Sequence, residues 1–199
     1  WLDPENTEVL TFDGVEHEVS GSGIIAGYVT NENGIGIKNA EIHLTGARDT
    51  MVMTDEEGYY EFSNLPFGGI YEVSLSKDVN ARNGVSTFDL VKITQHIIGA
   101  SELDSPYKML AADVNNSGTI STLDLIMIRR LILSIDLEFA NVPSWIFLPW
   151  TFEFDDPTNP FNSTVPNSVQ VTSFSEDIID LDFMGIKMGD VNISASPSG

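Results

Sequence analysis

One arrangement of residues occurs twice in this chain of 199 residues, 35 positions apart, and the two copies align without a gap. Each copy starts with Asp-Val-Asn, crosses a polar loop to Ser-Thr-x-Asp-Leu, and then places isoleucines at helical spacing. Coincidence does not reproduce such spacing, so the duplicated loop–helix unit constrains the fold more than any other feature. Oxygen-bearing residues stand at loop positions 1, 3, 9 and 12 of each copy. They are Asp78, Asn80, Ser86 and Asp89 in the first copy, and Asp113, Asn115, Ser121 and Asp124 in the second.

The second copy has the complete spacing of a loop that wraps a hard cation. Calcium loops take side-chain oxygens at positions 1, 3, 5, 9 and 12, a carbonyl at 7, and a glycine at 6 for the sharp turn. A capping box from Ser121 to Asp124 and an Asx-turn at Asp113 would explain only parts of this pattern, and not Gly118 at position 6. The predicted calcium ligands are Asp113, Asn115, Ser117, the carbonyl of Thr119, Ser121 directly or through water, and Asp124.

The first copy departs from the pattern, because Arg82 stands at position 5 and Gly84 falls at position 7. Two interpretations stay open: a weaker calcium site completed by a backbone carbonyl or the Asn83 amide, or a guanidinium in place of the cation. A third Asp-Val-Asn begins at Asp190, where we expect a turn or, alternatively, a carboxylate for a third ion. The sequence thus predicts one or two calcium ions, with a third as the alternative. The candidate ligands of the first loop are Asp78, Asn80, Ser86 and Asp89.

Local patterns divide the chain into four segments and predict a mostly β member of the α+β class. Residues 1–20 are expected to form an extended lead-in strand, with a frayed terminus as the alternative. Residues 21–77 alternate short β runs with turns, as in a small β-sandwich. Residues 78–135 hold both loops in a three-helix module, and residues 136–199 form a β-rich C-terminal segment. Whether the two β segments form one sandwich or two stays open.

Alternation, turn residues and helix caps predict the individual elements. The strands expected in the first β segment are 24–30, 41–45, 50–54, 59–62 and 71–75. The expected helices are 87–98, 105–112 and 122–134, the second with Ser105 as N-cap and Pro106 at the first helical position. The strands expected after the helices are 145–148, 150–154, 169–171 and 178–188.

Composition excludes several classes of function. Nine Lys and Arg against 30 Asp and Glu give a net charge of −21, which repels nucleic acid and anionic lipid. The chain has no cysteine, which excludes disulfides, zinc–thiolate sites and thiol nucleophiles. Its three histidines, His17, His43 and His96, do not stand at metal spacing, and no phosphate loop or nucleophile elbow occurs. We therefore expect no enzymatic activity and no membrane insertion.

Two stretches resemble known families. The run Thr54–Phe62, followed by Asn64-Leu65-Pro66-Phe67-Gly68, resembles the carboxypeptidase-regulatory-like and Cna-B-like sandwich domains, whose role is that of spacers and stalks. The paired loop–helix units with a helix between them resemble dockerins, calcium-binding modules that plug into cohesin domains and use Asp at position 12. The order of the later half, ending in Gly-Ile-Lys-Met-Gly-Asp-Val-Asn, resembles modules in large secreted proteins of Bacteroidetes-type bacteria.

These resemblances and residues lead to three hypotheses for an extracellular or cell-surface protein. The favoured hypothesis is a non-enzymatic calcium-binding building block of an adhesin or filament, which self-associates through strands such as 6–12. The second is a docking module for a cohesin-like partner, with the exposed pairs Ser86-Thr87 and Ser121-Thr122. The third is an accessory domain of a secreted hydrolase, with Trp145 and Trp150 binding carbohydrate.

Overall fold

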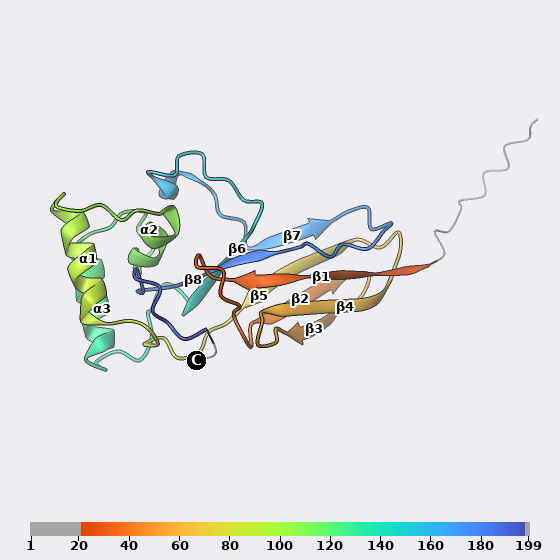
Figure 1. Ribbon diagram of the computed structural model, residues 1–199, viewed down its shortest axis with the longest axis horizontal. Helices are drawn as coiled ribbons and strands as arrows, with labels where there is room; N and C mark the ends of the chain where they lie inside the picture. The colour runs from red at the N-terminus through yellow and green to blue at the C-terminus, as the bar shows by residue number, and fades with distance from the viewer. Residues whose placement is uncertain (1–20, 198–199) are drawn as a thin grey trace, which may run out of the picture.

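The computed structural model describes residues 21–197, which form a β-sandwich with three helices at one end (Figure 1). The segment 1–20, including the expected adhesive strand 6–12, lies outside the described residues. Figure 1 shows the sandwich and the helices side by side along the longest axis of the molecule. The predicted mostly β fold of the α+β class is confirmed.

Eight strands build two four-stranded sheets. The first sheet contains β1 (Ser22–Thr30), β4 (Tyr59–Pro66), β6 (Trp145–Pro149) and β8 (Phe183–Lys187), in the order β4-β1-β8-β6. The second sheet contains β2 (Glu41–Gly46), β3 (Thr50–Met53), β5 (Tyr71–Ser76) and β7 (Ser168–Val171), in the order β3-β2-β5-β7. Alternating side chains of both sheets meet in one apolar core, as in other sandwiches.

The C-terminal strands complete both sheets. Strand β8 runs parallel to β1, with Val29 opposite Phe183 and Thr30 opposite Met184, and it pairs antiparallel with β6. Strand β7 pairs antiparallel with β5 and so extends the second sheet. The two β segments on either side of the helices therefore share their sheets and form one sandwich, which settles the question that the sequence left open.

The three helices lie between β5 and β6 in the chain and begin at the predicted caps. They are α1 (Thr87–Ile97), α2 (Pro106–Ala112) and α3 (Thr122–Ile132). Ser86 and Ser121 each form a capping box with the aspartate three residues later, and Ser105 caps α2. No helix in the described part of the chain is long and apolar enough to cross a bilayer.

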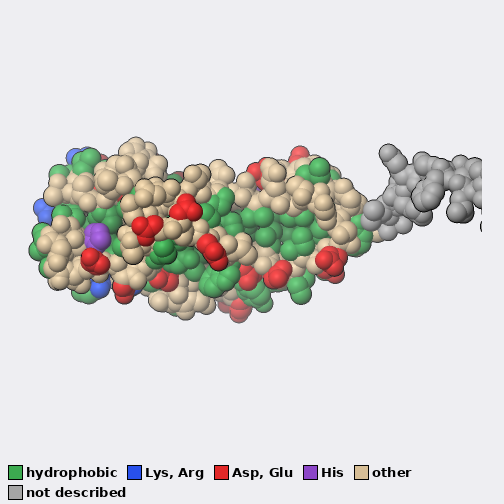
Figure 2. Space-filling view, turned by 90° about the horizontal axis from the view of Figure 1, so that it is seen from above, with side chains coloured by type: hydrophobic (Ala, Val, Ile, Leu, Met, Phe, Trp, Pro, Cys, Tyr) green, Lys and Arg blue, Asp and Glu red, His purple; other side chains and the backbone are tan. Residues whose placement is uncertain are grey.

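A second apolar core joins the helices to the sandwich. Ile93 of α1 and Ile128 of α3 are fully buried, and they belong to the same cluster as Leu148, Met184 and Ile186 of the first sheet. The helices therefore pack on the end of the sheet and do not form a separate globule. Figure 2 shows carboxylates scattered along the viewed face of the whole body, while Lys and Arg gather at its helical end.

The strand predicted over 150–154 is wrong. Phe152 N donates to Pro149 O at 2.9 Å, so the chain turns away from the sheet at the end of β6. The ring of Phe154 then packs edge-on against Phe152 and against Tyr107 of α2. These alternating aromatic residues cover a helix instead of extending a sheet. The strand predicted over 178–188 is shorter, because β8 begins only at Phe183.

Candidate metal centre

The loop between α2 and α3 gathers its two carboxylates around its own backbone. Asp113, at the C-terminal end of α2, accepts hydrogen bonds from Ser117 N at 3.0 Å and from Gly118 N at 2.7 Å. Asp124, in the first turn of α3, accepts from Ser121 N at 2.9 Å and reaches back to Asn115 N at 3.2 Å. Asp113 is 5% exposed and Asp124 is fully buried. Both carboxylates are therefore held by backbone N–H groups of this one loop.

An amide oxygen in this loop has no hydrogen-bond partner. Asn115 Oδ1 is buried, and no residue that the structure describes donates to it. A buried polar atom without a partner costs about 1–3 kcal/mol, so in a native protein such an atom is expected to bind an ordered water or an ion. Ser117 Oγ donates to Thr119 O at 3.1 Å, which brings the oxygens of positions 5 and 7 together.

The donor set fits calcium. Two carboxylates, one free amide oxygen, a hydroxyl and a carbonyl are hard oxygen donors, and calcium takes six to eight of them in flexible geometry. Within residues 21–197 no cluster of three or more His, Cys, Asp or Glu occurs that could hold a metal ion, so neutral oxygens have to supply the remaining ligands. The hydroxyl of Ser121 is already used in capping α3, which favours a water-mediated contact at position 9.

The first loop does not assemble in the same way. Asp78, its position 1, accepts from the backbone N and the hydroxyl of Ser144 at 2.8 and 2.9 Å, and not from its own loop. The carbonyl of Asn80 accepts from Asn83 N in a local turn. No hydrogen bond among the described residues joins Asp78 or Asn80 to Asp89. Of the four predicted ligands, the structure brings together only Ser86 and Asp89, in the capping box of α1.

The side chains that break the first loop have other partners. Arg82 is exposed, and its guanidinium donates to the hydroxyl of Ser134 beyond the end of α3. Asn83 binds the backbone of Ser196 in both directions, at 2.6 and 3.1 Å. These contacts tie the first loop to α3 and to the C-terminal segment. The hydrogen bond of Arg82 to Ser134 does not support the interpretation in which its guanidinium occupies the cation position.

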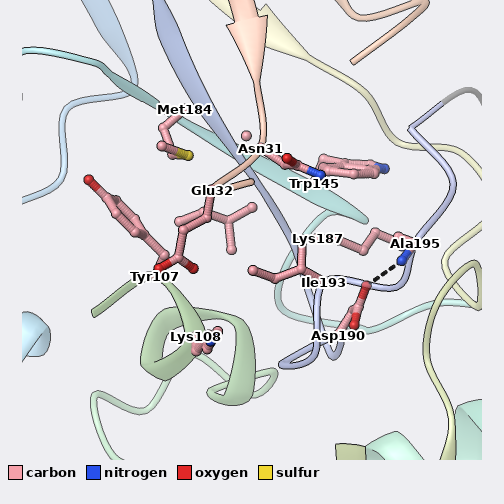
Figure 3. A pocket seen from close by; sticks show the side chains of 12 residues that line it. Asn31, Glu32, Tyr107, Lys108, Trp145, Met184, Lys187, Asp190, Ile193 and Ala195 are labelled. Atoms are coloured by element: carbon pink, nitrogen blue, oxygen red, sulfur yellow. Dashed lines mark hydrogen bonds between the residues drawn. The ribbon is translucent and has the colours of Figure 1, made fainter. Parts of the chain in front are cut away.

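Asp190 has a larger part in this region than the sequence alone indicated. Its carboxylate accepts from Ser194 N at 3.2 Å and from Ala195 N at 2.6 Å, the latter drawn in Figure 3. The same turn also contacts Asp89 of α1, whose carboxylate accepts from Val191 N at 3.0 Å and from Asn192 N at 3.2 Å. The third Asp-Val-Asn is the only sequence signal that the C-terminal turn would contact Asp89. Nothing in the sequence indicated that Ser144 would hold Asp78.

Burial and charge act together around Asp190. Burial raises the pKa of this carboxyl, the backbone N–H groups of the turn lower it, and the nearby charge of Asp89 raises it again. Burial lowers the pKa of Lys187 to about 8, while the charges of Asp190 and Asp78 oppose that change. The ammonium of Lys187 donates to Ala81 O at 2.9 Å and to Ser144 O at 3.2 Å. It therefore binds carbonyls and forms no direct ion pair with either carboxylate.

Comparisons with known proteins agree with this architecture. Residues 24–94 match the model of the carboxypeptidase regulatory-like domain, and residues 76–133 match that of the dockerin type I domain. The two matches overlap across the first loop and part of α1, and the second includes the whole loop between α2 and α3. A search of curated proteins found no match.

Among solved structures, BcpA, the major pilin subunit of Bacillus cereus, aligns at 25% identity with a TM-score of 0.26. The alignment covers 29% of this chain and 19% of that pilin, so it spans less than a fifth of the pilin's length. A TM-score this low does not establish a shared fold. By the two family matches, the chain carries a carboxypeptidase-regulatory-like segment followed by a dockerin-like segment, which confirms the resemblance indicated by the sequence.

Proposed function

We propose that this chain is a non-enzymatic, calcium-stabilised interaction module of a secreted or cell-surface protein, with α1 and α3 as its docking face. Calcium held by the loop 113–124 fixes the start of α3 relative to α2. Binding energy then contributes to folding energy, because the assembled ligand set does not exist in the unfolded chain. The dockerin match over 76–133 supports this assignment.

One observation carries the calcium part of the proposal: the buried, unpartnered Oδ1 of Asn115 beside two buried carboxylates. Helix capping alone accounts for Ser121 and Asp124 but leaves this amide oxygen at an energetic cost. A calcium ion removes the cost by accepting the lone pair. All six predicted ligands then take part, with Asp113 and Asp124 supplying the negative charge.

The docking part rests on apolar side chains that repeat with the same offset as the loops. Three positions on α1 or just beyond it and three on α3 or just beyond it are more than half exposed. The pairs are Phe88 and Leu123, Val91 and Ile126, and Ile98 and Leu133. Exposed apolar patches of this kind favour protein partners. A duplicated patch also favours docking over a surface that is apolar by accident.

A filament or adhesin building block is the second candidate, and the edge strand β3 favours it. Met51 and Met53 on this strand are about half exposed, and only β2 pairs with it among the described strands. Edge strands with apolar side chains can pair with a second chain. The carbohydrate-binding alternative loses its basis, because Trp145 is buried while Trp150 is exposed, so the two indoles share no surface.

The test is metal analysis of the untreated full chain, combined with thermal unfolding with and without a chelator. We expect bound calcium and a loss of stability on chelation, about 2.7 kcal/mol if calcium stands at 100 times its Kd. Asp124→Asn should reproduce most of the loss, while Asp156→Asn, at an exposed aspartate, should not. A chain without bound metal and without a shift on chelation would overturn the proposal.

Sedimentation of the calcium-loaded chain separates the two candidates. A docking module remains a monomer at tens of micromolar concentration, because its apolar face fits a different protein. A building block associates at these concentrations. Self-association that is abolished by Met51→Lys would favour the second candidate. A monomeric chain whose stability is unchanged by Phe88→Asp would favour docking.

A further inference from the structure

We infer that a second calcium site is assembled from two distant parts of the chain, the C-terminal turn at 190–194 and the start of α1. This inference deepens the proposed calcium binding and rests on it, because the loop 113–124 serves as its template. Positions 1, 3 and 5 come from Asp190, Asn192 and Ser194, and positions 7, 9 and 12 come from Gly84 O, Ser86 and Asp89.

The first carboxylate shares two backbone contacts in both places. Asp190 accepts from the backbone N–H groups four and five residues later, at 3.2 and 2.6 Å. Asp113 accepts from the N–H groups four and five residues later, at 3.0 and 2.7 Å. Asp78, which the sequence places at position 1 of the first loop, binds Ser144 instead. Asp190 therefore takes the place that Asp78 leaves.

The closing carboxylate matches as well. Asp124 accepts from the N–H of the serine that caps its helix and from Asn115 N, at 2.9 and 3.2 Å. Asp89 accepts from the N–H of its own capping serine and from Asn192 N, also at 2.9 and 3.2 Å. In the first case the position-3 residue belongs to the same loop. In the second it comes from the other end of the chain, about a hundred residues away.

Positions 5 and 7 of the ligand set are also joined by a hydrogen bond between the two segments. Ser117 Oγ donates to Thr119 O at 3.1 Å, which links positions 5 and 7 of the continuous loop. Ser194 Oγ donates to Gly84 O at 3.0 Å, which links the corresponding positions of the divided one. Each position of the template between 1 and 12 that supplies an oxygen therefore has a counterpart at the junction of the two segments.

Backbone conformation agrees with this correspondence. Ile193 and Asn116, both at position 4, have a φ of 56°. A β-branched residue is rare in this left-handed region and is held there only by its surroundings. A Cβ on Gly84 would lie 2.5 Å from Ala195 Cα, so the glycine allows the two segments to touch. The chain is thus shaped to bring the C-terminal turn onto the first loop.

The charges at the junction call for a cation. Asp89 is fully buried and Asp190 is 4% exposed, and neither takes part in an ion pair among the described residues. Both carboxylates accept from the N–H of Asn192, at 3.2 Å each, and two buried carboxylates this close are strongly unfavourable unless a cation compensates them. The ammonium of Lys187 does not pair with either carboxylate, because it donates to the carbonyls of Ala81 and Ser144.

A neutral oxygen is also free at this site. The side-chain amide of Asn192 makes no hydrogen bond with any residue that the structure describes, and only its backbone N–H is bonded. The amide oxygen of Asn115 at the same position of the template is likewise without a donor. Both amides stand at position 3 beside two buried carboxylates, and the half-buried amide of Asn192 has an oxygen left for the same hard cation.

The experiment is calcium titration of the metal-free full chain by calorimetry, with metal counted after dialysis against calcium. The wild-type chain should bind two ions. Asp190→Asn should bind one, or weaken one site at least about tenfold, a change of about 1.4 kcal/mol. Asp78→Asn, a matched change at the nominal position 1 of the first loop, should still bind two. Asp113→Asn should lose the other ion.

Asn192→Ala guards against a variant that fails to fold, because it removes only a side chain without hydrogen bonds in the described structure. It should weaken the same ion as Asp190→Asn while the far-UV circular dichroism stays unchanged. Two ions retained in both variants, or an ion lost in Asp78→Asn instead, would overturn the divided site. One ion, lost only in Asp113→Asn, overturns it and leaves the proposed function intact, whereas no ion at all overturns both.

Discussion

Asn115 is the single residue that distinguishes the proposed calcium loop from a loop that only caps a helix. Replacing it with leucine, which has a similar size, removes the unpartnered oxygen and also the ligand. In chelator the variant should unfold at the same free energy as the wild type or up to about 1 kcal/mol higher, because no polar atom is left unsatisfied. In calcium it should be the less stable of the two.

Denaturant unfolding in chelator and in calcium measures whether the effect of Asn115→Leu on the free energy of unfolding changes sign between the two conditions. Gln170→Leu, at an exposed position on β7, is the control and should shift neither curve by more than about 0.5 kcal/mol. An Asn115→Leu variant that is destabilised by the same amount with and without calcium would mean that the amide has a purely structural role.

Asp78 gives the opposite prediction. Its carboxylate accepts two charge-assisted hydrogen bonds from Ser144, which fasten the end of β5 to the start of β6. Asp78→Asn should therefore cost about 1–3 kcal/mol, and the cost should be equal in calcium and in chelator. Thermal unfolding in the two buffers measures it, and a cost confined to the calcium buffer would return Asp78 to the list of ligands.

The sequence predicts the single residues of the second loop better than those of the first. Loop 113–124 is continuous, so spacing alone indicates which oxygens can converge. Asp78 and Asp190 carry the same Asp-Val-Asn signal, and the choice between them depends on how strands far apart in the chain fold together. Only the folded molecule contains that information.

Helices and strands were predictable where local chemistry decides them. Serine caps, Pro106 and isoleucine spacing place all three helices within a few residues, because each signal acts inside one turn. The strand predicted over 150–154 failed for a tertiary reason. Phe152 and Phe154 alternate as in a strand, but their rings pack on Tyr107 of α2.

The contact of this aromatic segment with α2 gives a prediction for the element. Phe154→Ala should destabilise the chain by about 1–3 kcal/mol, since it removes a partly buried ring that packs against Phe152 and Tyr107. Phe88→Ala is the matched control, because the ring of Phe88 is 56% exposed and should cost less than about 0.5 kcal/mol. Urea unfolding measures both, and equal losses would show that the aromatic contact does not stabilise α2.

The net charge of −21 shapes the behaviour of the whole molecule. Carboxylates scattered over the body repel one another (Figure 2). At the proposed sites each calcium ion would neutralise two buried carboxylates. The metal-free chain should therefore gain thermal stability as sodium chloride rises from about 0.02 to about 0.5 M, because salt screens the repulsion. The calcium-loaded chain should gain less, and scanning calorimetry compares the two series. An equal gain in both would show that calcium does not relieve this repulsion.

The strand order is the part of the fold that the sequence could not supply. Periodicity indicates that β1 and β8 are strands, but nothing local indicates that they are neighbours, because about 150 residues lie between them. The helical module is inserted within a sandwich that only the last strands complete. A division of the chain into consecutive segments therefore separates strands that fold as one body.

The parallel pairing of β1 with β8 has a mechanical consequence. Hydrogen bonds join β1 to β8 and to residues 178–181 just before β8, and both strands run toward the helices (Figure 1). A pull on Ser22 and Lys187 in opposite directions slides the strands past each other and stretches these bonds all at once, not one after another. The helices are inserted between β5 and β6, outside this direct line of force. The sandwich can bear tension while α1 and α3 stay folded and able to hold a partner.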